Sequence, residues 1–127
     1  AVESNEPNVR REALRSIGKL KERAPLEGRL VVPLLVGGMS DTDAGVRAVA
    51  ATYLGIVHED PAACVPVLTE ALEDGDTEVR RAAAGALAAF GSDAAPALPA
   101  LRRAAGDRDP EVAREAGVTL VKLQSGK

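Results

Sequence analysis

The sequence repeats itself with a period of 33 residues, and no other feature restricts the fold as strongly. Five columns of identical residues recur in three successive copies. A unit of this length cannot bury an apolar face by itself, so the copies are expected to stack on one another. The columns are Pro33, Pro66 and Pro99; Asp41, Asp74 and Asp107; Asp43, Asp76 and Asp109; Val46, Val79 and Val112; and Leu54, Leu87 and Leu120.

Each copy has the pattern of two helices joined by a short acidic turn. In the first segment of one copy, Cys64, Leu68 and Leu72 recur at helical spacing, and a similar apolar stripe begins at Val79 in the second segment. The second segment follows an aspartate such as Asp76, a residue type that caps helix N-termini by accepting free backbone N–H groups. The pattern predicts helices over residues 8–22, 28–40, 44–57, 61–73, 77–90, 94–105 and 110–124.

A partial fourth copy precedes the three full ones. Val9, Arg10 and Ala13 match Val46, Arg47 and Ala50 at an offset of 37 residues. The predicted fold is therefore all-α, a right-handed α-solenoid of about three and a half helical hairpins with seven helices. It consists of one domain, with a half repeat at 1–27 and repeats at 28–60, 61–93 and 94–127. The unpaired half repeat at the start has two interpretations: its strongly charged exposed side can act as a cap, or the chain is a piece cut from a longer array. We favour the second.

The amino-acid composition agrees with a core of small side chains. The chain has 24 Ala but only one Phe, one Tyr and no Trp. No stretch approaches the roughly 18 apolar residues of a membrane span, and a single Cys cannot form an internal disulfide. With 16 basic and 19 acidic residues, the net charge is −3. These properties favour a cytoplasmic protein that does not enter membranes.

The unit resembles a HEAT repeat, in particular the bacterial type akin to the phycobilisome-lyase HEAT-like repeats. The resemblance rests on a proline in the first helix, an aspartate eight residues later and an arginine six residues beyond, as in Pro66, Asp74 and Arg80. It implies a ladder of hydrogen bonds between neighbouring units, formed by Asp41, Arg47, Asp74, Arg80 and Asp107. Ser4 and Ala113 stand where the first aspartate and the last arginine would be, so the ladder is expected to be weak or absent at both ends.

The second helices of such a stack line its concave side, so their positions outside the apolar stripe form the candidate binding surface. The middle of this surface is apolar, with Val49, Tyr53 and Ile56, and basic residues lie at its ends and along one edge. This pattern suits an acidic amphipathic peptide or a partner helix. In the competing interpretation, neighbouring units half cover these residues and the arginines are solvated or belong to the ladder. The basic residues are Arg11, Arg15, Lys19, Arg81, Arg114 and Lys122.

Catalytic, metal and cofactor sites are not expected. His58 is the only histidine and Cys64 the only cysteine, and neither has a partner at a spacing typical of nucleophilic catalysis or zinc binding. Cys64 falls in a core column, which predicts a small buried hydrophobe. The repeated aspartates of the turns are explained by helix capping and by the helix dipole, without a metal ion.

HEAT-like arrays mostly bind proteins as scaffolds and adaptors, so the resemblance implies a non-catalytic scaffold with its partner on the concave face. Two alternatives stay open. The first is a bilin lyase-like enzyme or accessory subunit, although two aromatic rings are few for gripping a pigment. The second is weak, sequence-independent nucleic-acid binding through residues 8–23, which carry six basic and two acidic residues. Nucleic acid is nevertheless an unexpected partner for a chain with an acidic balance.

Overall fold

The computed structural model describes residues 6–23 and 28–125, and within these residues the regular structure is entirely helical. The expectation of an all-α fold is thus confirmed. Most of the predicted ranges agree with the observed helices to within two residues. The helical elements are α1 (Pro7–Arg23), α2 (Gly28–Gly38), α3 (Ala44–Val57), α4 (Pro61–Ala71), α5 (Thr77–Leu87), the 3-10 helix η2 (Ala88–Ala97), α6 (Leu98–Ala104) and α7 (Pro110–Ser125).

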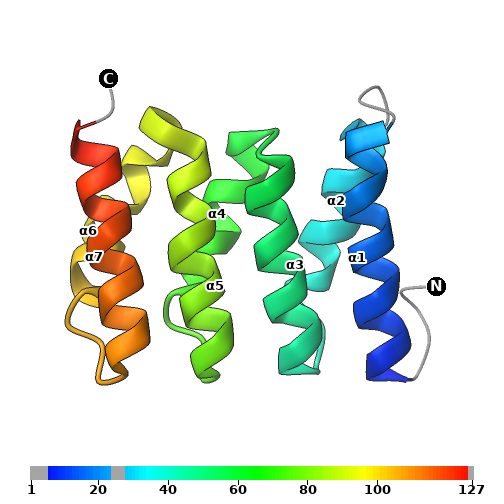
Figure 1. The fold of residues 1–127 in the computed structure, drawn as a ribbon, viewed down its shortest axis with the longest axis horizontal. Coiled ribbons are helices and arrows are strands. Elements are labelled where there is room, and N and C mark those ends of the chain that lie inside the picture. The colour runs from blue at the N-terminus through cyan, green and yellow to red at the C-terminus, as the bar shows by residue number, and fades with distance from the viewer. Residues whose placement is uncertain (1–5, 24–27, 126–127) are drawn as a thin grey trace.

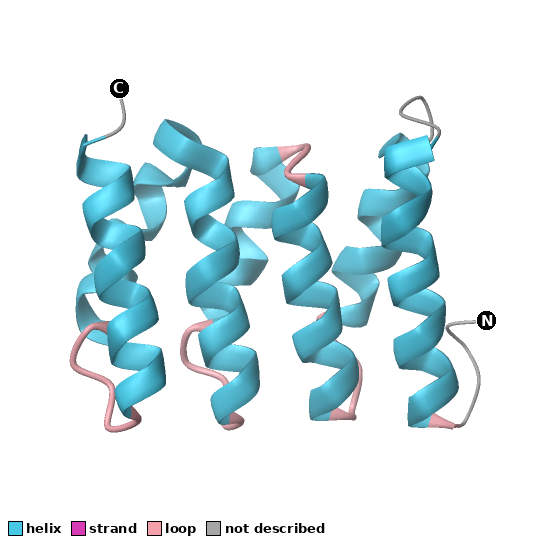
Figure 2. Ribbon diagram, in the orientation of Figure 1, coloured by secondary structure: helices cyan, strands magenta, loops and turns pink. Residues whose placement is uncertain are grey.

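The helices form two layers. In Figure 1, α1, α3, α5 and α7 stand side by side in the front layer, while α2, α4 and α6 lie behind them. Within the front layer, α3 contacts both α1 and α5, and α5 also contacts α7. Figure 2 shows that the turns leading into α3, α5 and α7 all lie at the same end of that layer. The 33-residue period therefore brings equivalent turns next to one another.

The repeated aspartates begin the helices of the front layer, as the capping pattern predicts. The carboxylate of Asp43 accepts a hydrogen bond from the backbone N–H of Val46 at 2.9 Å. Asp76 accepts from Glu78 and Val79 at 2.9 and 3.1 Å. Each cap satisfies N–H groups that have no partner inside the helix, so the start of every front-layer helix after α1 is set by its own sequence.

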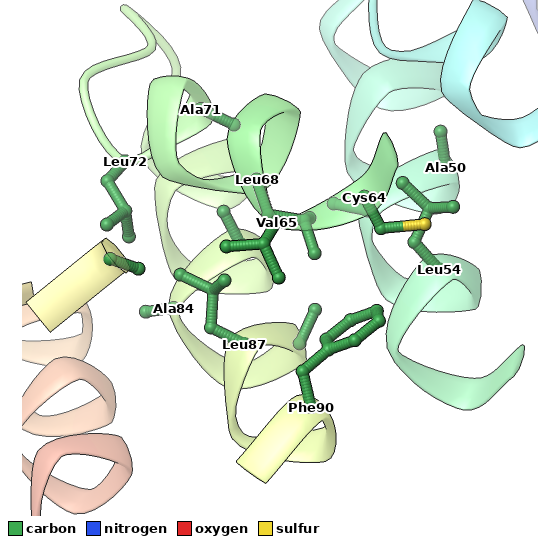
Figure 3. Close-up of a cluster of buried hydrophobic side chains, with 14 of the residues drawn as sticks. Ala50, Leu54, Cys64, Val65, Leu68, Ala71, Leu72, Ala84, Leu87 and Phe90 are labelled. Carbon is green, nitrogen blue, oxygen red and sulfur yellow. The ribbon is translucent and has the colours of Figure 1, made fainter. Parts of the chain in front are cut away.

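The core lies between the two layers and consists of aliphatic side chains and alanines. Leu54, Leu68 and Leu87 are fully buried, and Figure 3 shows them close to Cys64 and Phe90. The alanines of one repeating column are fully buried as well, at Ala50, Ala83 and Ala116. Small residues in these columns let the helices of adjacent units approach closely, which explains how a chain with so few rings fills its core.

The region between α5 and α6 differs from the prediction. The expected helices over 77–90 and 94–105 are replaced by α5, η2 and the short α6, so the predicted scheme of seven helices is not confirmed in that form. Gly91 has φ 54° and ψ −135°, a conformation that glycine adopts and other residues avoid. Pro96 lies inside η2 and cannot donate a backbone hydrogen bond. These two residues interrupt the regular α-helical pattern, while the spacing of apolar residues continues through it.

In the front layer, α3 and α5 approach each other closely. A Cβ atom added to Gly55 would lie 2.8 Å from the Cα atom and 2.9 Å from the Cβ atom of Ala86. Real Cβ atoms do not approach backbone this closely, so only glycine permits this separation of the two helices. Gly117 in α7 is different, because a Cβ atom added there meets nothing within 4 Å.

Two matched substitutions test this contact. We expect Gly55→Ala to lower the free energy of unfolding by about 1–3 kcal/mol, because the new methyl group forces α3 and α5 apart. Gly117→Ala should instead raise it by about 0.5–1 kcal/mol, since alanine favours the helix and has room. Urea denaturation followed by circular dichroism measures both values. Equal effects of the two substitutions would contradict the close contact.

Candidate functional site

A groove with a volume of about 600 Å³ runs across the face of the front layer. Side chains from α1, α3, α5 and α7 all contribute to its lining. Its floor is formed mainly by α3 and α5 and is apolar. The floor residues include Val49, Tyr53, Ile56, Ala82 and Ala89.

The structure brings five of the nine predicted partner-binding residues together in this groove. They are Arg15, Val49, Tyr53, Ile56 and Arg81. The lining does not include Arg11, Arg114 or Lys122, and the side chain of Lys19 lies outside the described part of the chain.

Arg11 lies instead between α1 and the start of α3. Its Nε atom is 3.6 Å from the carboxylate of Asp43. The same atom would be 2.7 Å from a Cβ atom placed on Gly45, so the guanidinium packs directly on the α3 backbone. Arg11 therefore belongs to the contact between two neighbouring units rather than to the groove.

The rim of the groove carries both signs of charge, in place of the basic rim predicted from the sequence. Arg15 forms an ion pair with Glu12 at 2.9 Å, and Arg81 pairs with Glu78 at 2.5 Å. Glu78 and Glu115 also line the groove. The signal for these pairs was present in the sequence, because residues three apart on a helix are neighbours on its surface.

The Asp and Arg columns meet between consecutive units in bidentate ion pairs. The Nε and Nη2 atoms of Arg47 donate to the two carboxylate oxygens of Asp74 at 2.9 and 3.1 Å. Arg80 binds Asp107 in the same way, at 2.9 and 3.3 Å. These side chains are only 8–21% exposed. Such forked, partly buried pairs fix the geometry of both partners more strongly than an exposed ion pair does.

Each of these arginines also binds the turn of its own unit. The Nη1 atom of Arg47 donates to the backbone carbonyl of Asp41 at 2.8 Å, and that of Arg80 donates to the carbonyl of Asp74 at 2.9 Å. The Asp74 carboxylate in turn accepts the backbone N–H of Asp76 at 2.9 Å. One guanidinium therefore ties two successive turns together, and the pairs form a continuous ladder along one end of the layer.

Arg10 adds a rung that the sequence analysis did not include. Its Nε and Nη2 atoms donate to the carboxylate of Asp41 at 2.7 and 2.9 Å. The signal was the match of Arg10 to Arg47 in the partial copy. Each rung runs from the arginine of one unit to the aspartate of the next, and Ala113 therefore leaves α7 without this donor on its outer side. Ser4, the other predicted departure, lies outside the described residues.

The residues with ligand-type chemistry are not assembled into a site. Burial raises the pKa of the Cys64 thiol to about 11, and the negative charge of Asp60 adds to this effect. The Cys64 Sγ atom donates to the carbonyl of Glu59 at 3.2 Å. Among the described residues, no three His, Cys, Asp or Glu side chains gather as a metal site would require. None of the helices described is long and apolar enough to cross a membrane.

The comparisons with known proteins support one family. A family model described as HEAT repeats matches residues 1–64 and 65–126. No curated protein matches the chain. The solved structures of two engineered proteins are similar to it, each with 26% sequence identity, and their TM-scores are 0.79 and 0.72. The matches cover 98% and 99% of this chain, and 60% and 36% of those proteins.

A third similar structure is the complex of CpcE and CpcF of phycocyanin lyase from Nostoc sp. Its TM-score is 0.65 at 20% identity, and the match covers 96% of this chain and 62% of that one. At this level of identity the likeness concerns the fold alone. The chain thus spans between 36% and 62% of the length of these structures.

The adjacent residues Arg80 and Arg81 provide a matched test of the ladder. Arg80→Met leaves Asp107 without its forked donor in a partly buried place, so we expect the free energy of unfolding to fall by roughly 3 kcal/mol. The side chain of Arg81 is 42% exposed, and Arg81→Met should cost at most about 1 kcal/mol, as for other exposed ion pairs. Chemical denaturation measures the free energy of unfolding of both variants. Similar decreases for Arg80→Met and Arg81→Met would mean that the ladder adds little stability.

The ladder also predicts the response to acid. Burial of Asp74 acts to raise its pKa, but hydrogen bonds from Arg47 and from the backbone of Asp76 outweigh this effect and hold the pKa below its usual value. The folded protein therefore binds a proton at this carboxylate less readily than the unfolded chain does. Its contribution to stability is complete above the ordinary Asp pKa of about 3.9 and is lost as the pH falls through the lowered value.

We therefore expect the free energy of unfolding to decrease steeply between about pH 4 and pH 2. Asp74→Asn should be less stable at pH 6 and should show a shallower decrease, since one of the titrating groups is gone. Arg47→Met should flatten the curve in the same way, because it removes the guanidinium that lowers the pKa of Asp74. Unfolding titrations at several pH values measure these slopes. Three identical slopes would show that this carboxylate does not contribute to the acid response.

Proposed function

The chain belongs to the HEAT repeat family, and on that premise we propose that it is a non-catalytic scaffold that binds a helix of a partner protein in the groove. We also propose that the chain forms a right-handed α-solenoid of about three and a half helical hairpins, as its sequence predicts. HEAT repeats commonly bind proteins, so the family supports the class of function. The groove supports the position of the partner.

The observation that carries the proposal is the exposed apolar floor at the middle of the front layer. Ile56 is 48% exposed, and Val49 and Tyr53 beside it are half buried. Neighbouring units do not cover Ile56, although α3 is packed against α5 on this side. Removing such a patch from water contributes about 25 cal/mol for each Å² of apolar surface, against which the entropic cost of association must be set. Grouped apolar side chains on a surface mark interaction sites more often than scattered ones do.

The lining also indicates the chemistry of the partner. Ala82 and Ala89 in the lining have small side chains. Large apolar side chains from one face of a partner helix therefore have room to pack against the floor. The pairs Arg15–Glu12 and Arg81–Glu78 compensate each other's charge at the rim. The sequence pattern suits an acidic amphipathic peptide or a partner helix. Of these two, a partner helix with an apolar face and flanking charges of both signs fits this rim better.

The remaining chemistry of the chain supports a non-catalytic role. The only histidine, His58, is exposed at the end of α3, with its Nδ1 atom 3.0 Å from the carbonyl of Ile56. The Cys64 thiol is buried and has a raised pKa, which makes it a poor nucleophile at neutral pH. The described arginines of α1 face carboxylates, which weakens the case for binding a nucleic-acid backbone. They are Arg10 with Asp41, Arg11 with Asp43 and Arg15 with Glu12.

Two substitutions of equal chemistry and nearly equal exposure test the groove. Ile56 lies on its floor and is 48% exposed, whereas Val118 lies outside it on α7 and is 45% exposed. Ile56→Glu places a charge in the contact, so we expect it to reduce the captured amount of each specific partner at least about tenfold. Val118→Glu should leave capture unchanged. Quantitative affinity purification from the source cell, with both variants beside the unmodified chain, provides the measurement.

The outcome that contradicts the proposal is equally definite. If Ile56→Glu captures the same partners in the same amounts as the unmodified chain, the partner does not use the groove. Circular dichroism must show that both variants are folded, which is expected because neither substituted side chain is part of the core.

A further inference from the structure

One charged side chain of the groove has no ion-pair partner among the described residues. Four charged side chains of the described chain line the groove, and three of them belong to ion pairs. Arg15 pairs with Glu12, and Arg81 pairs with Glu78, so these charges compensate each other. None of the described hydrogen bonds or ion pairs includes the carboxylate of Glu115. The lining therefore carries one negative charge without a bound cation, on the side of α7.

The side chain of Glu115 leans from α7 over α5, its neighbour in the front layer (Figure 1). A Cβ atom added to Gly85 would lie 3.3 Å from the Glu115 Oε1 atom and 3.6 Å from its Cδ and Cγ atoms. Glu115 is half buried, and both residues line the groove. Because Gly85 has no side chain to cover the carboxylate, its oxygens are accessible from the groove. The packing of α7 on α5 sets their position.

The arginine on this side of the groove is already bound to another carboxylate. Arg81 donates to Glu78 at 2.5 Å. Its pKa is raised, first by this hydrogen bond, and the charges of Glu111 and Glu115 add to the effect. Glu111 is paired with Arg114 at 2.6 Å and adds no net charge. Glu78 and Glu115 thus share the single guanidinium of Arg81, which leaves a net charge of −1 where α5 and α7 line the groove.

The apolar floor lies next to this charge. Gly55 of α3 meets the backbone of Ala86 in α5, so their chain neighbours Ile56 and Gly85 lie on two helices in close contact, and both line the groove. Residues three or four apart on the surface of a helix are only about 5–6 Å apart. One face of a partner helix can therefore place an apolar side chain on Ile56 and a long cationic side chain on Glu115.

We propose that Glu115 determines the specificity of the groove by binding a lysine or arginine of the partner helix. The inference rests on the proposed function, since it names a side chain that the partner must carry. The cation donates a charge-assisted hydrogen bond to the carboxylate. An apolar residue three, four or seven positions away on the same face of the partner packs against Ile56. A helix with a neutral or acidic residue in place of the cation binds less tightly, because the Glu115 carboxylate then loses water without gaining a donor.

Selection from a peptide library tests the proposal with a defined probe. The library consists of displayed helical peptides of about 16 residues, long enough to form helices, with one face randomised. Peptides selected on the unmodified chain should be enriched in apolar residues and, at one position, in Lys or Arg. Glu115→Gln keeps the packing over Gly85 but lacks the charge, so selection on this variant should enrich the apolar residues alone.

Glu111→Gln is the matched control. Glu111 lies one turn earlier on α7, is 56% exposed and is not part of the groove lining, so this variant should select the same peptides as the unmodified chain. In fluorescence anisotropy, a selected basic peptide should bind Glu115→Gln about tenfold more weakly than the unmodified chain. Replacing the basic residue of the peptide by Gln should cause no further loss on Glu115→Gln, because both changes remove the same interaction.

The possible outcomes separate this inference from the proposed function. Apolar peptides without an enriched Lys or Arg overturn the inference but leave the groove as the binding site, provided that Ile56→Glu abolishes their binding. A basic residue that is enriched equally on Glu115→Gln, shown by circular dichroism to be folded, has the same meaning. If the library contains no peptide whose binding is abolished by Ile56→Glu, both the inference and the proposed function are wrong.

Discussion

The forked ion pair between an arginine of one unit and an aspartate of the next is the interaction on which the rest of the structure depends. A unit of two helices has too little apolar surface to hold its own shape, so its stability comes from its neighbours. Arg47 binds the carbonyl of Asp41 in its own turn and the carboxylate of Asp74 in the next. This fixes the spacing of two turns at one end of the layer. Because the caps start each helix at the turn, the register of the helices follows from it.

That register places small residues opposite one another. Gly55 meets the backbone of Ala86, and a column of alanines is buried between the layers. Close helix packing of this kind leaves little room for large side chains inside, so the larger residues outside the stripe remain at the surface. The low number of aromatic residues suits this close packing, and Tyr53 and Ile56 lie outside it on the floor of the groove.

Equivalent outward-facing residues of the front layer have different surroundings in different units. Glu115 faces Gly85 of α5 and also lines the groove, while its equivalent Glu12 in α1 is exposed. Arg81 borders the groove, and its equivalent Arg114 lies on α7 outside it. One repeated residue type therefore lines the groove in the middle of the front layer and lies outside it in the helices at the edges.

The sequence alone determined the period, the acidic turns and the capping aspartates, because each depends on local spacing or on a strict repeat. The pairing of the Asp and Arg columns was implied by the resemblance to HEAT repeats. The sequence also placed the apolar floor at Val49, Tyr53 and Ile56 on one helix face. Only the tertiary structure decided that the rim carries both signs of charge and that Arg10 forms a rung. It also showed the 3-10 segment Ala88–Ala97 in place of a simple helix end. The reason is physical: an arginine has several carboxylates within reach, and the packing of neighbouring units decides which one it binds.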